Sequence, residues 1–252
     1  MGTPLSIVMP VYNEAEVIAD VVDELTRDIC ARLDGAEIVM VDDGSTDGTP
    51  AILDELAASH SHVRVIHAER NQGHGPSLRM ALEDSVGDWI LQLDSDGQQR
   101  ASDFWKLWEL RDRVDLAVGV RVGRNEGPHR TAVTAAARWA NRLVGGGRLR
   151  DVNVPFKLIR REVWEDLRPC VPEVPVAPSL LIAVGASVRG WRVAEVEISH
   201  QARRAGNSTV DVPLLLRLTY GALRELIGFR ARLRRRAPRP ASEAERPVTT
   251  VS

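Results

Sequence analysis

The chain has 252 residues, which is enough for one large α/β domain with a buried core. Its 44% hydrophobic and 27% charged residues are ordinary for a globular protein, and a formal net charge of −2 gives no support for nucleic-acid binding. Two cysteines are too few for a disulfide framework. The sequence contains no uninterrupted apolar stretch of about 18 residues, so we expect no transmembrane helix and a cytoplasmic protein.

Apolar and amphipathic segments alternate in the first part of the chain. We expect buried strands over residues 5–10, 37–41, 63–67 and 89–93, and helices over residues 14–33, 49–59 and 75–85. This alternation predicts an α/β fold with a mainly parallel sheet and helices on both faces. Ligands of such sheets bind at the carboxyl ends of the strands.

The second half is less regular, with further strands expected over 116–120, 155–159 and 192–198. Helices are expected over 103–113, 130–143 and 179–186. From Pro213 a long basic amphipathic helix begins, and from Ala237 the composition predicts disorder. We therefore divide the chain into a catalytic domain (1–211), a basic amphipathic helix (212–236) and a disordered tail (237–252).

The acidic segment after the strand over 89–93 is the first candidate site. Asp94 and Asp96 are two residues apart in a loop, so both carboxylates can face one hard cation, and Gln98 can add a neutral oxygen ligand. Mg²⁺ or Mn²⁺ held there would neutralise the charge of a departing diphosphate. A solvated turn rich in Asp and Gly is the alternative interpretation of these residues.

Polar residues also follow the first two strands. Tyr12 and Asp43 fit a nucleotide, since an aromatic ring can pack on a base and a carboxylate can accept from its N–H groups. Asn13 and Asp47 can instead cap the helices that follow them. His74 is a minor candidate for contact with donor or acceptor.

Several motifs occur in a fixed order across residues 5–210, and together they resemble the family 2 inverting glycosyltransferases of the GT-A fold. The similarity is greatest to the branch of dolichyl- and polyprenyl-phosphate mannosyl- and glucosyltransferases. The matching segments are 6–14, 41–47, 71–73, 87–88, 94–98, 119–121 and 200–208.

This resemblance implies roles for individual residues. The nucleotide-sugar pocket would be lined by Pro10, Tyr12, Glu14, Val41, Asp43, Ser95, Gln98 and Ser208. The metal would be held by Asp94, Asp96 and Gln98. Arg121 and Arg203 would contact the diphosphate or an acceptor phosphate, for which a guanidinium fork is suited.

Two features favour a lipid phosphate as the acceptor, a missing carboxylate and the C-terminal helix. A hydroxyl acceptor needs a general base. The resemblance implies an Asp ahead of a helix as this base, as in many family 2 enzymes, but the corresponding residues 175–181 contain no acid. A phosphate acceptor is already ionised and needs none. The expected helix over 212–236 combines leucines with arginines, which favours a peripheral position on a membrane.

The leading hypothesis is therefore metal-dependent, inverting transfer of a hexose from a GDP- or UDP-linked sugar to a polyprenyl phosphate at the cytosolic membrane face. One alternative is a glycosyltransferase with a soluble acceptor, such as a secondary metabolite. Another is a nucleotide-sugar-binding protein without catalytic activity. The base, the sugar and the oligomeric state are not specified by the sequence.

Overall fold

The computed structural model describes residues 2–121, 149, 154–199, 212–237 and 249–251. The strands within these ranges form one mixed sheet. The strand order is β3-β2-β1-β4-β6-β5-β7-β8. Strand β6 runs antiparallel to β4 and β5, and the other neighbouring strands are parallel. The strands are β1 (Leu5–Val11), β2 (Glu37–Asp42), β3 (Val63–His67), β4 (Trp89–Leu93), β5 (Leu116–Arg121), β6 (Phe156–Arg160), β7 (Val193–Ile198) and β8 (Thr249–Val251).

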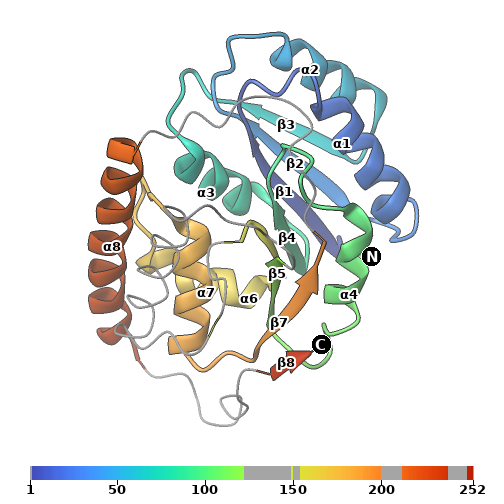
Figure 1. Ribbon diagram of the computed structural model, residues 1–252. Helices are drawn as coiled ribbons and strands as arrows, with labels where there is room; N and C mark the ends of the chain where they lie inside the picture. The colour runs from blue at the N-terminus through green and yellow to red at the C-terminus, as the bar shows by residue number, and fades with distance from the viewer. Residues whose placement is uncertain (1, 122–148, 150–153, 200–211, 238–248, 252) are drawn as a thin grey trace.

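Helices cover both faces of this sheet (Figure 1), which confirms the predicted fold class. One face carries α1 (Ile18–Leu25), the π-helix η1 (Thr26–Cys30), α2 (Thr49–Ser59), the 3-10 turn η2 (Ala101–Asp103) and α4 (Phe104–Trp108). The other carries α3 (His74–Asp84), α6 (Arg161–Leu167), the 3-10 turn η3 (Arg168–Cys170) and α7 (Pro178–Val188), with α8 (Val212–Arg234) outside α7.

The sheet separates two hydrophobic cores. Every residue of β1, β2 and β4 is buried, as expected for strands of a parallel sheet covered on both faces. Within β1, Ile7 and Met9 contact the core under α1 and α2, whereas Val8 between them contacts the core under α3 and α7. The period of two along a strand thus divides an almost continuous apolar run between the two faces.

Most expected elements are present, but three helices differ from the sequence prediction. The first helix begins at Ile18 rather than at residue 14, because the loop before it is bonded to the loop after β2. The helix expected over 103–113 is limited to α4 and a 3-10 turn. Helix α6 was not predicted, since seven residues give too little periodicity to recognise.

The C-terminal segments are described in part. The helix expected from residue 212 is present as α8, and none of the described helices is both long and apolar enough to cross a membrane. Of the tail, Thr249–Val251 pair with β7 as strand β8. The helix expected over 130–143 and the tail residues 238–248 and 252 lie outside the described part of the chain.

Candidate functional site

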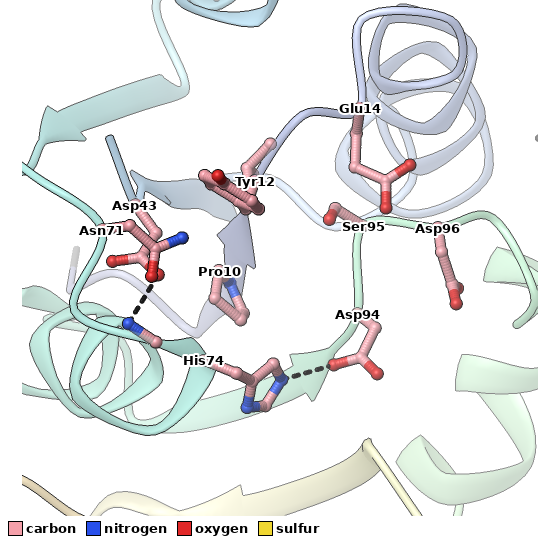
Figure 2. Close-up of a pocket in the computed structure, with 11 residues that line it drawn as sticks. Pro10, Tyr12, Glu14, Asp43, Asn71, His74, Asp94, Ser95 and Asp96 are labelled. Atoms are coloured by element: carbon pink, nitrogen blue, oxygen red, sulfur yellow. Dashed lines mark hydrogen bonds and ion pairs between the residues drawn. The ribbon is translucent and has the colours of Figure 1, made fainter. Parts of the chain in front are cut away.

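The carboxyl ends of β1, β2 and β4 meet the start of α3 around a cavity of about 300 Å³. Figure 2 shows Asp43 and Asn71 on one side of Pro10 and Tyr12 and, in this view, Asp94, Ser95 and Asp96 on the other. The polar clusters predicted at three separate strand ends therefore line one site. The lining residues are Pro10, Val11, Tyr12, Glu14, Asp43, Asn71, Gly73, His74, Asp94, Ser95 and Asp96.

The loop carrying Tyr12 is bonded to the loop that follows β2. The backbone N–H of Asn13 donates to Ser45 Oγ at 3.0 Å, and Asn13 Oδ1 accepts from the backbone N–H of Thr46 at 2.8 Å. The backbone N–H of Glu14 donates to Thr49 Oγ1 at 2.9 Å. These bonds hold the half-exposed ring of Tyr12 at the cavity rim, where it can pack on a flat ligand.

The same contacts decide the two capping predictions. Asn13 does not cap the first helix, because its side chain is bonded to Thr46 and α1 has no side-chain cap. Asp47 is not the N-cap of the second helix, which is Gly48, but its Oδ1 does accept from the backbone N–H of Thr49, the first residue of α2, at 2.9 Å. Its side chain also accepts from Ala15, so Asp47 joins the two loops as well.

Asp43 fixes the opposite wall of the cavity. Its carboxylate is buried and accepts three hydrogen bonds of 2.8 Å, from the backbone N–H groups of Gln72 and Gly73 and from Ser77 Oγ. The next residue, Gly44, has φ 68°, and a side chain there would lie 2.6 Å from the Arg70–Asn71 backbone. Asp43 thus holds the loop before α3 against the end of β2 and also lines the cavity.

His74 makes a direct contact with the candidate metal ligand Asp94. The distance from His74 Nε2 to Asp94 Oδ1 is 2.9 Å. Burial disfavours the charged imidazole, but Asp94, with smaller contributions from Asp43 and Asp96, outweighs burial and raises the pKa of His74. Asp43, Asp94 and Asp96 thus place three carboxylates around this end of the cavity, close to His74.

A negative, oxygen-rich edge fits a divalent cation. Asp96 Oδ1 accepts from the backbone N–H of Gln98 at 3.1 Å across Gly97, whose φ is 68°, and this tight turn directs the loop away from β4. Within the described ranges no three His, Cys, Asp or Glu side chains group closely enough to hold a metal ion by themselves. Two carboxylates with phosphate and water oxygens would complete the usual shell of Mg²⁺.

Other predicted site residues lie elsewhere. The Val41 side chain is fully buried in the core under α3, so it does not line the cavity. Gln98 and Arg121 are half-buried, and neither is among the lining residues. Arg203 and Ser208 lie outside the described residues.

Sequence reasoning assigned no role to three further lining residues, Val11, Asn71 and Gly73, and gave His74 only minor weight. Asn71, Gly73 and His74 could have been found from their position between the third strand and the third helix, at the same sheet edge as the acidic clusters. The segment 71–73 was among those that resemble the family, but the resemblance assigned no role to its residues.

Comparison with known proteins identifies related sequences. A family model described as glycosyl transferase family 2 matches residues 6–168. Glycosyltransferase AglD of Haloferax volcanii is 32% identical over 222 residues, covering 84% of this chain and 35% of the relative. Undecaprenyl-phosphate 4-deoxy-4-formamido-L-arabinose transferase of Yersinia pestis is 27% identical over 218 residues, covering 86% of this chain and 65% of the relative. The chain thus spans 35% and 65% of the lengths of these two relatives.

Solved structures share the fold. Glucosyl-3-phosphoglycerate synthase of Mycobacterium tuberculosis, in complex with Mn²⁺, uridine diphosphate and glucosyl-3-phosphoglycerate, superposes with a TM-score of 0.69 at 20% identity. The match covers 91% of this chain and 81% of that one. S. aureus TarS superposes with a TM-score of 0.56 at 16% identity, over 90% of this chain and 72% of that one.

Proposed function

The chain belongs to glycosyl transferase family 2 and has the GT-A fold, and from this premise we propose a donor, a metal and an acceptor for it. The reaction is inverting transfer of a hexose from a nucleotide diphosphate sugar to a polyprenyl phosphate. The observation that carries the proposal is the single cavity in which Tyr12, Asp43, Asp94 and Asp96 converge from three strand ends.

The donor occupies this cavity with its diphosphate toward Asp94 and Asp96. These two carboxylates, with Gln98 after the turn, would hold Mg²⁺ or Mn²⁺, which supplies charge neutralisation for the leaving diphosphate. Support comes from the position of Asp94 and Asp96 on the wall of the same cavity, with one residue between them, after the end of β4. A fold relative from M. tuberculosis was solved with Mn²⁺ and UDP-glucose, which supports the same donor class here.

The protein side chains bind and orient the donor. The Tyr12 ring packs against the base at the rim, and Asp43 keeps the opposite wall in place through its three hydrogen bonds. His74 orients the carboxylate of Asp94 through their 2.9 Å contact. Ser95, which is buried between the two acids, faces the nucleotide sugar.

Arg121, Arg203 and Ser208 complete the proposed substrate contacts. Arg121 ends β5, and its backbone pairs in register with Ile198 at the end of β7. The segment that carries the other two residues begins directly after β7. Arg121 therefore lies at the carboxyl end of β5, where ligands of such sheets bind. Arg203 and Ser208 follow β7, the parallel neighbour of β5, in the sequence.

The acceptor is a polyprenyl phosphate. One relative is named as an undecaprenyl-phosphate transferase, which supports this acceptor class. The carboxylates that line the cavity are Glu14, Asp43, Asp94 and Asp96, and the last three have assigned roles in structure or metal binding. A phosphate nucleophile, which is ionised near neutral pH, needs no further base.

Helix α8 gives a second reason to propose a lipid acceptor. Its exposed side chains include Tyr220, Leu223 and Ile227 together with Arg224 and Arg234. Exposed apolar and cationic side chains on one helix suit an interface with anionic lipid. We therefore place the enzyme peripherally on the cytosolic face of a membrane.

A soluble acceptor is the second candidate function. It is favoured by the M. tuberculosis fold relative, whose structures contain phosphoglyceric acid, a soluble phosphate-bearing molecule. The two candidates are separated by incubating the enzyme with labelled UDP- and GDP-sugars and a short polyprenyl phosphate, followed by organic extraction. Label in the organic phase supports the lipid acceptor, whereas product confined to water with a soluble acceptor refutes it.

The metal assignment is tested by Asp96→Asn. The variant keeps the size of the side chain but removes a ligand charge, so we expect kcat to fall at least about a hundredfold with the thermal midpoint little changed. Asp54→Asn, on the exposed face of α2, is the matched control and should leave kcat unaltered. Near-normal turnover of Asp96→Asn with saturating Mn²⁺ would remove Asp96 from the metal site.

A further inference from the structure

Most of the exposed large hydrophobic side chains in the described part of the chain lie on α8 and on the loop that is bonded to it. Tyr220, Leu223 and Ile227 stand on one face of α8, and Val174 and Val176 lie in the loop Val171–Ala177 before α7. Val174 is 72% exposed and Tyr220 is 70% exposed. We call these five residues the loop–helix patch. Single exposed apolar residues are normal, but a group of this kind marks a binding surface.

The two parts of the loop–helix patch are joined by a defined contact. The Glu225 carboxylate accepts from the backbone N–H of Val176 at 2.9 Å and from that of Ala177 at 3.0 Å. One turn earlier, Gly221 faces Val176, whose Cγ2 would lie 3.6 Å from a side chain at position 221. The loop therefore lies directly against the flank of α8 that carries Gly221 and Glu225, and it brings two exposed valines next to the helix.

The opposite face of α8 holds the helix on the protein. Leu226, Phe229 and Leu233 are buried in the core under α7. Arg232 Nε donates to the Cys170 carbonyl at 2.6 Å, so the helix is fixed on the side of the loop as well. These contacts set the rotation of α8, which lies at the outside of the molecule (Figure 1), and leave Tyr220, Leu223 and Ile227 exposed.

The charges around the loop–helix patch select its partner. Arg224 and Arg234 are exposed on α8 and Arg235 is exposed directly after it, whereas Glu225 is bonded to the loop and Glu173 is exposed beside Val174. The exposed charges of the loop–helix patch are therefore mostly positive. An apolar and cationic surface is attracted to anionic lipid. It would repel the same surface of a second copy, because both carry positive charge.

The loop also contacts the edge of the cavity. A side chain at Gly75, in the first turn of α3, would lie 1.8 Å from the carbonyl oxygen of Pro175, so loop and helix backbone touch there. The preceding residue, His74, lines the cavity. On α3, Arg79 Nη1 donates to the Val171 carbonyl at 2.8 Å. The loop thus lies between α8 and the cavity rim.

We propose that the loop–helix patch docks on the surface of an anionic bilayer, and that Glu225 is a positioning residue that keeps the loop tip in this surface beside the cavity. The relevance of docking to catalysis rests on the lipid-phosphate acceptor proposed above. The docking itself does not, because it is measured without substrate.

The docking is tested with the full chain and vesicles of phosphatidylcholine, with or without phosphatidylglycerol. Val174→Ser and Ile227→Ser should each lower the partition coefficient onto phosphatidylglycerol vesicles about fivefold, as expected when part of one aliphatic side chain leaves lipid. Val86→Ser is the matched control, because Val86 is 58% exposed but lies at the other end of the sheet, beside Ser6. Point substitutions are preferred to removal of α8, since removal would uncover the core around Phe229.

Each result of this experiment decides the proposal. A loss with both variants and none with the control supports it. A loss with Ile227→Ser alone would confine lipid contact to the helix and overturn the two-part surface. No loss with either variant overturns docking altogether, as does a dimer in sedimentation experiments that both substitutions convert to a monomer.

The role of Glu225 is tested by a double-mutant cycle. Glu225→Gln leaves one oxygen for two backbone N–H donors, so the loop tip should leave the lipid surface, and Val174→Ser should then have no further effect on partitioning. A merely destabilising change would leave the fivefold effect of Val174→Ser intact, and that result overturns the positioning role. Glu225→Gln should also raise KM for polyprenyl phosphate in vesicles while kcat stays within about twofold.

Failure of the acceptor assignment looks different. If no labelled sugar enters the organic phase with the unmodified enzyme, the lipid-phosphate acceptor is wrong, whatever the vesicle measurements show. If labelled lipid forms but Val174→Ser and Ile227→Ser bind vesicles normally, the acceptor stands and the docking surface is wrong.

Discussion

Replacing Asp43 by asparagine tests how the cavity wall is held. The carboxylate Oδ1 accepts from Gln72 N–H and Ser77 Oγ, and Oδ2 accepts from Gly73 N–H. An asparagine of the same size has one oxygen and one NH₂ group. In either amide orientation, the backbone N–H of Gln72 or Gly73 therefore faces a donor instead of an acceptor.

The expected loss of stability follows from these bonds. A buried donor without an acceptor costs roughly 1–3 kcal/mol, and the remaining two bonds each lose about 1 kcal/mol when the acceptor becomes neutral. The neutral amide is cheaper to bury than a carboxylate, which offsets part of this sum. We expect Asp43→Asn to lower the free energy of unfolding by about 3 kcal/mol, or Tm by roughly 6–12 °C for a chain of this size.

Urea denaturation gives the free energy, and calorimetric titration with UDP and GDP in the presence of Mn²⁺ shows whether donor binding falls with it. Asp54→Asn is the control, because it removes the same charge from a side chain that is 72% exposed and is bonded to His67 at the surface. Its effect should stay below about 0.5 kcal/mol. A loss under about 1 kcal/mol for Asp43→Asn would refute the reasoning.

Three further measurements test other parts of the structure. Gly75→Ala places a methyl group 1.8 Å from the Pro175 carbonyl oxygen, so overpacking should lower the free energy of unfolding in urea by about 2–3 kcal/mol. At the control Gly48→Ala the nearest atom is 3.7 Å away, and the loss should stay under about 1 kcal/mol. Equal losses would contradict the packing of the loop on α3. Burial would raise the pKa of Asp115, but its hydrogen bonds and charge contact with Arg192 lower it. A carboxyl group whose pKa is lower in the folded state stabilises the fold at pH values above its unfolded-state pKa, and this stabilisation is lost as the pH falls through the folded-state pKa. The native chain should therefore be much more stable than Asp115→Asn at neutral pH, and the difference should shrink below about pH 4. A difference independent of pH would contradict this. Chelation by EDTA should weaken binding of UDP or GDP at least about tenfold, with recovery on addition of Mn²⁺ or Mg²⁺, and unchanged binding would argue against a metal-bound diphosphate.

The donor half of the fold was predictable because its signals are local. Strands β3 and β4 and helix α2 have the predicted bounds, since short apolar runs and helical periodicity mark them directly. The strand ends then placed Tyr12, Asp43 and Asp94 at one sheet edge, and the structure brings them together around the cavity. Parallel pairing carries this inference, because it puts every carboxyl end on the same side.

What the sequence could not show depends on contacts between distant segments. The loop bond from Asn13 to Thr46 delays the start of α1, and no local pattern at residue 14 reports it. Val41 matched a family motif, yet its place inside β2 turns its side chain into the core. His74 was undervalued because its partner Asp94 lies 20 residues away.

The antiparallel strand β6 also governs how the protein can fold during synthesis. Strands β4 and β5 are successive in the chain, yet they are not paired with each other, because β6 lies between them and bonds to both. The first four strands can form a sheet as they emerge, but that sheet keeps an open edge at β4 until residue 160 has left the ribosome. Nascent chains that stall between β5 and β6 therefore expose the unpaired apolar edge of β4. Their risk of aggregation should be greatest during this interval of synthesis.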